Sequence, residues 1–279
     1  MSKKMIYLIS FVLVLGLATS VVSAEPLRQD PGPDGIVSVE AENFDENTPD
    51  GAHEWVFATE PAGFSGTGFM RAMPDGGGGG TPQLDFVVEF VKTGTHYVWV
   101  RGYSTSGTDD SCHVGLDGDV TTSDRIQAGS GNSTWEWSIQ RRESLGPAQF
   151  EVASAGVHTV NVLMREDGWR FDKIVLTTNP DYRPTGEGPE ESHRGARLKA
   201  YKPIPDDGAL LEDTWVSLSW SAGETAVSQD VYFGDNFNDV NDGTGHVPGQ
   251  SALGVFCCRF SRIPFSGRPC FGHDILLAD

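Results

Sequence analysis

The sequence predicts an all-β protein, and three observations support this fold class. Short runs of alternating apolar and polar residues recur along residues 36–180, separated by turns rich in Gly, Asn, Asp and Ser. The 279-residue chain contains 34 Gly and 16 Pro, a composition typical of loop-rich β proteins. No segment shows a sustained helical apolar period with caps. We therefore expect a jelly-roll-like β-sandwich with a C-terminal partial second β-sandwich.

The alternation predicts the strands of the first sandwich in chain order. They cover residues 36–40, 84–90, 97–101, 114–116, 135–139, 150–152, 157–164 and 171–176. Side chains two residues apart share one face of a strand, so Val98 and Val100 should face the core. Trp99 and Arg101 should then point the other way, as should Arg165 at the end of a second, similar strand.

The first 24 residues have the pattern of a secretory signal peptide. Lys3 and Lys4 precede an apolar run, and small residues at 22–24 suit cleavage after Ala24. An uncleaved membrane anchor is the alternative, because the apolar run approaches the length that spans a bilayer. We expect a protein that is secreted or held at the cell surface.

Composition divides the rest of the chain into five stretches. They are a lead-in at 25–35, the sandwich at 36–180, a polar linker at 181–202, a second patterned stretch at 203–248 and a discordant tail at 249–279. The second stretch has two or three strand patterns, too few to close a sandwich. The tail has no clear alternation, which is also compatible with disorder.

The charge of the chain excludes some classes of partner. With 20 Lys and Arg against 39 Asp and Glu, the net charge is −19, and no basic run occurs. Nucleic acids and anionic membranes are bound by clustered basic side chains, so we expect neither as a partner beyond the signal peptide.

The four Cys lack the regular spacing of a disulfide framework. We expect a monomer.

Four motifs in the first sandwich together resemble a known group of proteins. They are VEAENF (39–44), GFSGTGFM (63–70), YVWVRGYS (97–104) and REDGWRFDKIVLT (165–177). This series is similar to carbohydrate-binding modules of families 6 and 35, which are galactose-binding-domain-like β-sandwiches. Residues 205–234 resemble the front half of a fibronectin type III-like module of exported bacterial polysaccharide-degrading proteins. The resemblance implies binding to polysaccharide without catalysis.

Three carboxylates are candidate metal ligands. Glu40 and Glu42 are two residues apart in an expected strand and so should share a face, and hard cations prefer oxygen ligands. The spacing alone favours the alternative, in which both are solvated carboxylates on an edge strand. The resemblance adds Asp172 as a third ligand and implies a structural Ca²⁺ that joins the first and last strands, with carbonyls from the loop at 63–68.

Sugar recognition requires flat apolar rings for stacking and fixed polar groups for hydroxyls. Trp169 lies in a turn before the last strand, where the resembled families place ligand contacts, although it could equally pack on its own loop. Trp99, Arg101 and Arg165 form the outward stripe and could line a binding face or only cover the sheet. Asp110 follows a strand and could bind hydroxyls or be a solvated turn residue.

The sequence therefore predicts an exported, non-catalytic module that attaches to polysaccharide through Trp stacking and hydrogen bonds. One alternative is a fragment of a larger glycoside hydrolase or polysaccharide lyase, because no pair of acids in the chain is singled out as a glycosidase pair. The other alternative is an adhesive surface protein that binds protein partners.

Overall fold

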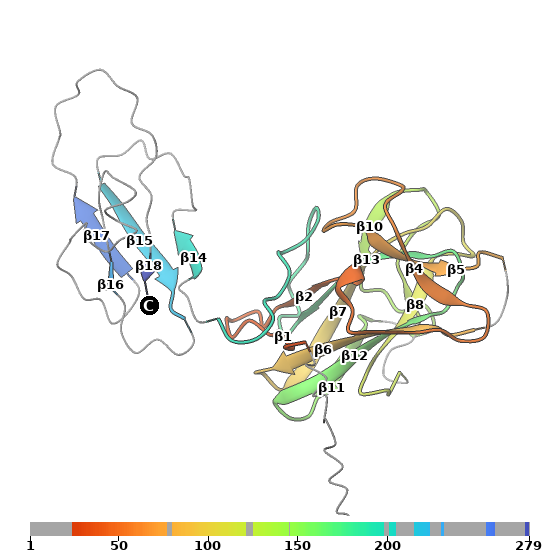
Figure 1. Ribbon diagram of the computed structural model, residues 1–279, viewed down its shortest axis with the longest axis horizontal. Coiled ribbons are helices and arrows are strands. Elements are labelled where there is room, and N and C mark those ends of the chain that lie inside the picture. The colour runs from red at the N-terminus through yellow and green to blue at the C-terminus, as the bar shows by residue number, and fades with distance from the viewer. Residues whose placement is uncertain are drawn as a thin grey trace, which may run out of the picture.

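The first sandwich consists of two β-sheets that enclose one apolar core (Figure 1). The computed structural model describes residues 24–76, 80–120, 125–144, 146–197, 201–204, 215–223, 230–231, 255–259 and 277–278. Within these residues the only helix is the 3₁₀ turn η1 at Ala41–Asn43, so the all-β prediction is confirmed. No helix in this part of the chain has the length and apolar character needed to cross a membrane.

The strands pair largely in antiparallel fashion. The six-stranded sheet has the order β1 (Leu27–Arg28), β6 (Gln83–Phe90), β12 (Gly156–Met164), β8 (Ser111–Leu116) and β9 (Ile126–Gln127), with β3 (Glu46–Thr48) also paired to β6. The seven-stranded sheet has the order β10 (Trp135–Ser138), β7 (Gly94–Tyr103), β13 (Arg170–Thr177), β5 (Phe69–Met73) and β4 (Glu54–Ala58). In the same sheet, β11 (Gln149–Val152) pairs with β7 and β2 (Val37–Glu40) pairs with β13.

The strand β7 obeys the predicted alternation. Val98 and Val100 are fully buried in the core between the sheets. Side chains alternate across a strand, so Trp99 and Arg101 lie on the opposite face, which we call the outer face of the seven-stranded sheet.

The strand β13, which is the last of this sheet in chain order, contains a bulge. Phe171 pairs with Gly102 and Lys173 pairs with Arg101, so the register shifts at Asp172. A bulge inserts one extra residue and re-aims the side chains beside it. Asp172 and Lys173 both contact partners on the outer face, although regular alternation would separate them.

Residues 181–195, which we call the strap, run across the outer face and differ from the expected linker. Trp137 Nε1 donates to the carbonyl of Gly186 at 3.0 Å. Further along, the backbone N–H of Ser192 donates to the carbonyl of Ser38 at 2.7 Å. The strap is polar because backbone groups and charged side chains attach it, so its composition resembles that of a linker.

The lead-in at 25–35 also belongs to the sandwich. Its residues 27–28 form the parallel edge strand β1 on β6, where Leu27 pairs with Val88 and is fully buried. The side chain of Gln29 accepts hydrogen bonds from the backbone of Val91 and Lys92.

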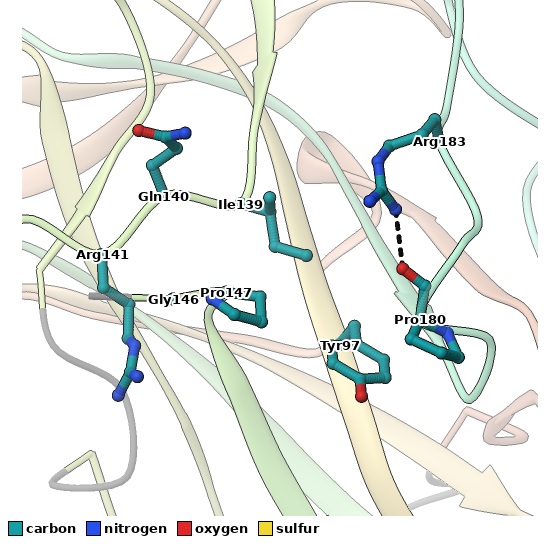
Figure 2. Close-up of a pocket in the computed structure, with 8 residues that line it drawn as sticks. All are labelled: Tyr97, Ile139, Gln140, Arg141, Gly146, Pro147, Pro180 and Arg183. Atoms are coloured by element: carbon teal, nitrogen blue, oxygen red, sulfur yellow. Dashed lines mark hydrogen bonds between the residues drawn. The ribbon is translucent and has the colours of Figure 1, made fainter. Parts of the chain in front are cut away.

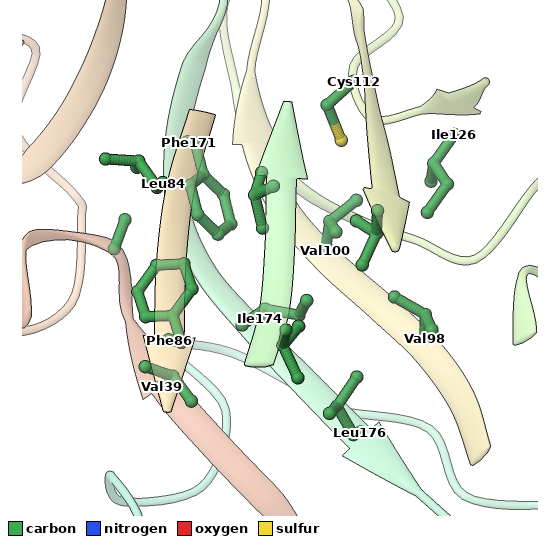
Figure 3. Packing of buried hydrophobic residues seen from close by; sticks show 14 of the residues in the cluster. Val39, Leu84, Phe86, Val98, Val100, Cys112, Ile126, Phe171, Ile174 and Leu176 are labelled. Atoms are coloured by element: carbon green, nitrogen blue, oxygen red, sulfur yellow. The ribbon is translucent and has the colours of Figure 1, made fainter. Parts of the chain in front are cut away.

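Aromatic and aliphatic side chains from both sheets fill the core (Figure 3). Trp169 is fully buried there: its ring stacks on Phe171 at 5.6 Å between centroids and meets the edge of Trp55 at 6.0 Å. Its Nε1 donates to the carbonyl of Ala128 at 2.8 Å, so the only polar atom of the indole is satisfied. Cys112 is buried as a free thiol in the same cluster.

The C-terminal part of the chain is described only in short segments. The strands β14 (Tyr201–Ile204), β15 (Trp215–Ser221) and β17 (Val255–Arg259) form one sheet, and β16 (Asp230–Val231) pairs with β18 (Leu277–Ala278). β17 and β18 fall within residues 249–279, for which the sequence predicts a discordant tail. Most of the expected fibronectin type III-like module, and nearly all of the signal peptide, lie outside the described residues.

Replacing Trp169 by Ala should destabilise the sandwich. The substitution removes a fully buried indole and leaves a cavity, which typically costs about 3–5 kcal/mol of the free energy of unfolding. Urea unfolding measures this change, and Val157→Ala is the control because Val157 is 61% exposed and should change stability by less than about 0.5 kcal/mol. An unchanged stability in Trp169→Ala would contradict this packing.

Candidate functional site

The outer face of the seven-stranded sheet is rich in aromatic side chains. Tyr97, Trp99 and Tyr103 alternate along β7 on this face. Trp135 pairs with Tyr103 in the neighbouring strand β10, and Trp137 pairs with Arg101, so both Trp side chains share the face. This sheet surface therefore carries several flat rings.

The strap and the loop at 59–68 close the middle of this face. The guanidinium carbon of Arg183, in the strap, lies 5.4 Å from the centroid of the Trp99 ring, and Trp99 is only 7% exposed. Arg101 is 6% exposed because it donates to the carbonyl of Gly63 in the loop and to Asp172. Neither Trp99 nor Arg101 is therefore accessible to a polysaccharide, and the prediction that they bind it is wrong.

A cleft of about 480 Å³ opens beside the covered part of the face (Figure 2). Its lining residues are Tyr97, Ile139, Gln140, Arg141, Gly146, Pro147, Pro180 and Arg183. The volume lies in the range of small-molecule sites. Tyr97 contributes an aromatic ring next to apolar Ile and Pro side chains, and polar groups surround them.

The polar groups of the cleft are mainly hydrogen-bond donors. Arg183 Nη1 donates to the carbonyls of Pro180 at 2.8 Å and Tyr182 at 2.6 Å, which holds the side chain over the cleft edge. A guanidinium carries five N–H donors, so those on Nη2 and Nε can turn to a ligand. Gln140 adds an amide, and Arg141 a second guanidinium. Ring and donors together have the chemistry needed to hold sugar hydroxyls.

A second accessible strip lies at the other end of the outer face. Trp135, Tyr103, Arg170 and Arg71 pair in register across β10, β7, β13 and β5 and form what we call the aromatic–arginine row. The Arg170 guanidinium lies 5.2 Å from the Tyr103 ring centroid and 3.5 Å from Asp109. The side chains of the row are more fully engaged with one another than the side chains that line the cleft.

Asp109 holds the loop that borders the aromatic–arginine row. Its carboxylate accepts hydrogen bonds from the backbone and hydroxyl of Thr105 and of Ser106, at 2.6–3.1 Å. Burial tends to raise the pKa of Asp109, but these hydrogen bonds outweigh it and hold the pKa below its usual value.

The remaining predicted sugar ligands do not meet at one site. Trp169 is in the core with no exposed surface, so the prediction that it stacks on sugar is wrong. Asp110 is 7% exposed and accepts a hydrogen bond from Gln127, which makes it a loop-fixing residue. Arg165 follows β12 in the opposite sheet and pairs with Glu166, so it does not share a stripe with Trp99.

The three predicted metal ligands lie around one loop, where Glu40 and Asp172 share a hydrogen-bond partner and Glu42 has different ones. Glu40 and Asp172 flank the hydroxyl of Ser65, at 2.6 Å and 3.1 Å. Glu42 is in η1, because β2 ends at Glu40, and it accepts hydrogen bonds from the backbone of Thr67 and Gly68. Burial raises the pKa of Asp172 to about 6, against the lowering effect of the Arg101 hydrogen bond and charge.

These residues fit a calcium ion poorly. Asp172 is already paired with Arg101 at 2.6 Å and Glu40 with Lys173 at 2.7 Å. Within the described residues, no three His, Cys, Asp or Glu side chains are grouped so that they could hold a metal ion. The calcium site stays a sequence-based prediction, and Tm measurements with and without calcium test it.

None of the residues that line the cleft is among the predicted sugar ligands, and Tyr97 and Arg183 show why. The signal for Tyr97 was present, since it lies two residues before Trp99 and one before the core residue Val98. Arg183 carried no signal, because its role depends on the path of the strap across the sheet.

Comparison with known proteins relates the sandwich to a described family. The family model for the glycosyl hydrolase family 115 C-terminal domain matches residues 32–191. A curated relative, uncharacterized protein P23 from Formosa agariphila, is 32% identical over 193 residues, which cover 56% of this chain and 47% of the relative. The chain thus spans about half the length of that relative. The resemblance to carbohydrate-binding families 6 and 35 in particular stays a prediction.

Several solved structures match part of this chain. The CBM35 from Paenibacillus barcinonensis is 20% identical with a TM-score of 0.38, over 51% of this chain and 99% of that chain. The GH26-CBM35 β-(1,4)-mannanase from Podospora anserina is 19% identical with a TM-score of 0.39, over 55% and 30%. The C-terminal CBM6 of LamC, a laminarinase from Zobellia galactanivorans, is 14% identical with a TM-score of 0.34, over 51% and 99%.

Asp109→Asn should reveal the charge of this carboxylate as a pH-dependent stability difference. A carboxyl with a lowered folded pKa stabilises the fold above its unfolded pKa, and this contribution is lost as the pH falls through the folded pKa. At pH 7 the variant should be less stable by about 1–3 kcal/mol, and the difference should narrow below about pH 4. Urea unfolding over a pH series measures it; a difference that stays constant into acid would contradict the assignment.

Proposed function

The chain belongs to the family of glycosyl hydrolase family 115 C-terminal domains, and on that premise we propose that it is a non-catalytic module that attaches to polysaccharide. The observation that carries this proposal is the cleft on the outer face, with Tyr97 among apolar side chains and Arg183, Arg141 and Gln140 around it. An aromatic ring beside several fixed donors is the usual composition of a sugar site.

In the proposed complex, sugar C–H groups stack on the ring of Tyr97 while Arg183 and Gln140 donate to hydroxyl oxygens. Arg183 is held in place by two backbone carbonyls and by the Trp99 ring beneath it, so little side-chain entropy is lost on binding. An open cleft of this size buries a short stretch of a chain. The affinity of one module should therefore be modest and increase where several modules act together.

Affinity electrophoresis in gels that contain xylans, pectins, β-glucans or agars tests the function. The full chain should be retarded in at least one gel. In that gel Tyr97→Ala should bind about tenfold more weakly, a loss of about 1.4 kcal/mol, because the stacking ring is gone. Tyr97→Phe is the matched variant: it keeps the ring and should keep most of the affinity.

Two further variants distinguish the cleft from other surfaces. Trp135→Ala alters the aromatic–arginine row and should leave retardation unchanged; if it abolishes binding while Tyr97→Ala does not, the polysaccharide binds the row instead. Val157 is an exposed residue of the opposite sheet, so Val157→Ala controls for effects of a substitution that do not depend on the outer face. No retardation in any gel would reject polysaccharide binding and favour an adhesive protein that binds protein partners.

The description of the family favours one alternative role. A domain found at the C-terminus of glycosyl hydrolases can serve a catalytic domain on the same polypeptide, and in this alternative the chain is part of a larger enzyme. The module alone should then release no reducing ends or unsaturated products from the same glycans. Measurable release would show catalysis and overturn the non-catalytic assignment.

We also propose that the protein is exported, because the first 24 residues have the signal-peptide pattern. In this proposal the module, acting as a monomer, holds its polypeptide on extracellular glycan. N-terminal sequencing of the protein from the growth medium should begin at Glu25; a start at Met1 in the membrane fraction would favour the anchor.

A further inference from the structure

Two carboxylates and a loop meet where the first and last strands of the seven-stranded sheet pair. Glu40 ends β2, and Asp172 is the bulged residue of β13. Ser65, in the loop between β4 and β5, lies between them: its hydroxyl is 2.6 Å from Glu40 Oε2, and its N–H donates to Asp172 Oδ1 at 2.9 Å. Two buried carboxylates this close repel each other unless positive charge is supplied.

Arg101 supplies part of that charge. Its Nη1 donates to Asp172 Oδ2 at 2.6 Å, and its Nη2 donates to the carbonyl of Gly63 at 3.0 Å. One carboxylate and one loop carbonyl are the kinds of oxygen that a hard metal ion would take. The guanidinium thus stands between the strand and the loop, where a bridging cation would also join them.

Lys173 supplies the second positive charge at this junction. Its ammonium group lies 2.7 Å from Glu40 Oε1 and donates to the carbonyls of Glu187 and Pro189 in the strap at 3.1 Å and 3.0 Å. An ammonium group has three N–H donors, so these contacts use all of them. The side chain of Lys173 is only 3% exposed, so its charge is buried together with the carboxylate of Glu40.

Glu42 has only one carboxylate oxygen without a hydrogen-bond partner, which is too few ligands for a calcium ion. Its Oε1 accepts hydrogen bonds from the backbone of Thr67 and Gly68, and only its buried Oε2 has no hydrogen-bond partner. Calcium takes six to eight oxygen ligands, whereas the oxygens of Glu40 and Asp172 already have partners.

We propose that Arg101 and Lys173 together replace a metal ion at this junction, and that the sandwich therefore folds without calcium. The two side chains neutralise both carboxylates and fasten the loop and the strap to the sheet. The cation that cross-links the first and last strands is part of the polypeptide.

Thermal unfolding of the full chain in excess EDTA and in millimolar calcium tests this proposal. The Tm should be the same in both solutions, and calorimetric titration with calcium should give no binding heat. A Tm that falls in EDTA and recovers with calcium would overturn the proposal and support the sequence-based calcium site. Neither result depends on whether the protein binds polysaccharide.

Arg101→Met provides the second arm. It leaves Asp172 as a buried, uncompensated carboxylate, and its Tm should fall by about 10 °C. Arg71→Met is the matched control, since Arg71 is 27% exposed and pairs with the exposed Asp75. If Arg101→Met does not fold, Arg101→Lys keeps the charge and should fold with a smaller loss. Equal small losses in Arg101→Met and Arg71→Met would overturn the role of Arg101.

Discussion

The buried ion pair between Arg101 and Asp172 is the interaction on which the outer face of the seven-stranded sheet depends. Both side chains are almost fully buried, and burying two charges costs several kcal/mol each unless they are paired and hydrogen-bonded. Pairing alone seldom offsets that cost. Here the carbonyl of Gly63 and the N–H of Ser65 add hydrogen bonds to the pair, although Arg101 Nε is buried without a partner, so the pair draws the loop onto the sheet. The closed middle of the face follows from this constraint.

Much of the fold could be predicted from the sequence because strand alternation reports which side chains face the core. Val98 and Val100 show this for β7. The position of Trp169 could not be predicted in the same way. A Cβ at Gly102 would lie 2.6 Å from the Trp169 ring, so the indole enters the core only because β7 carries Gly at that point. Such a close approach joins residues far apart in the chain and leaves no local pattern.

The candidate site was harder to predict because it depends on departures from regular strands. A period of two places Glu40 and Glu42 on one face of a strand, but β2 ends at Glu40 and the chain turns into η1. The bulge at Asp172 is a register shift that alternation cannot reveal. The sequence of the strap resembles that of a linker, because backbone hydrogen bonds such as that between Ser192 and Ser38 require no apolar residues.

The strap also explains why Tyr97 in particular is the aromatic residue of β7 that lines the cleft. A ring stacks on sugar only if one of its faces is open to solvent. Arg183 covers Trp99, and the cleft between the strap and residues 139–141 and 146–147 begins one position further along the outer face, at Tyr97. The same segment therefore buries one ring for stability and forms a wall of the cleft around the next. Because the family match extends to residue 191, most of the strap is part of the domain.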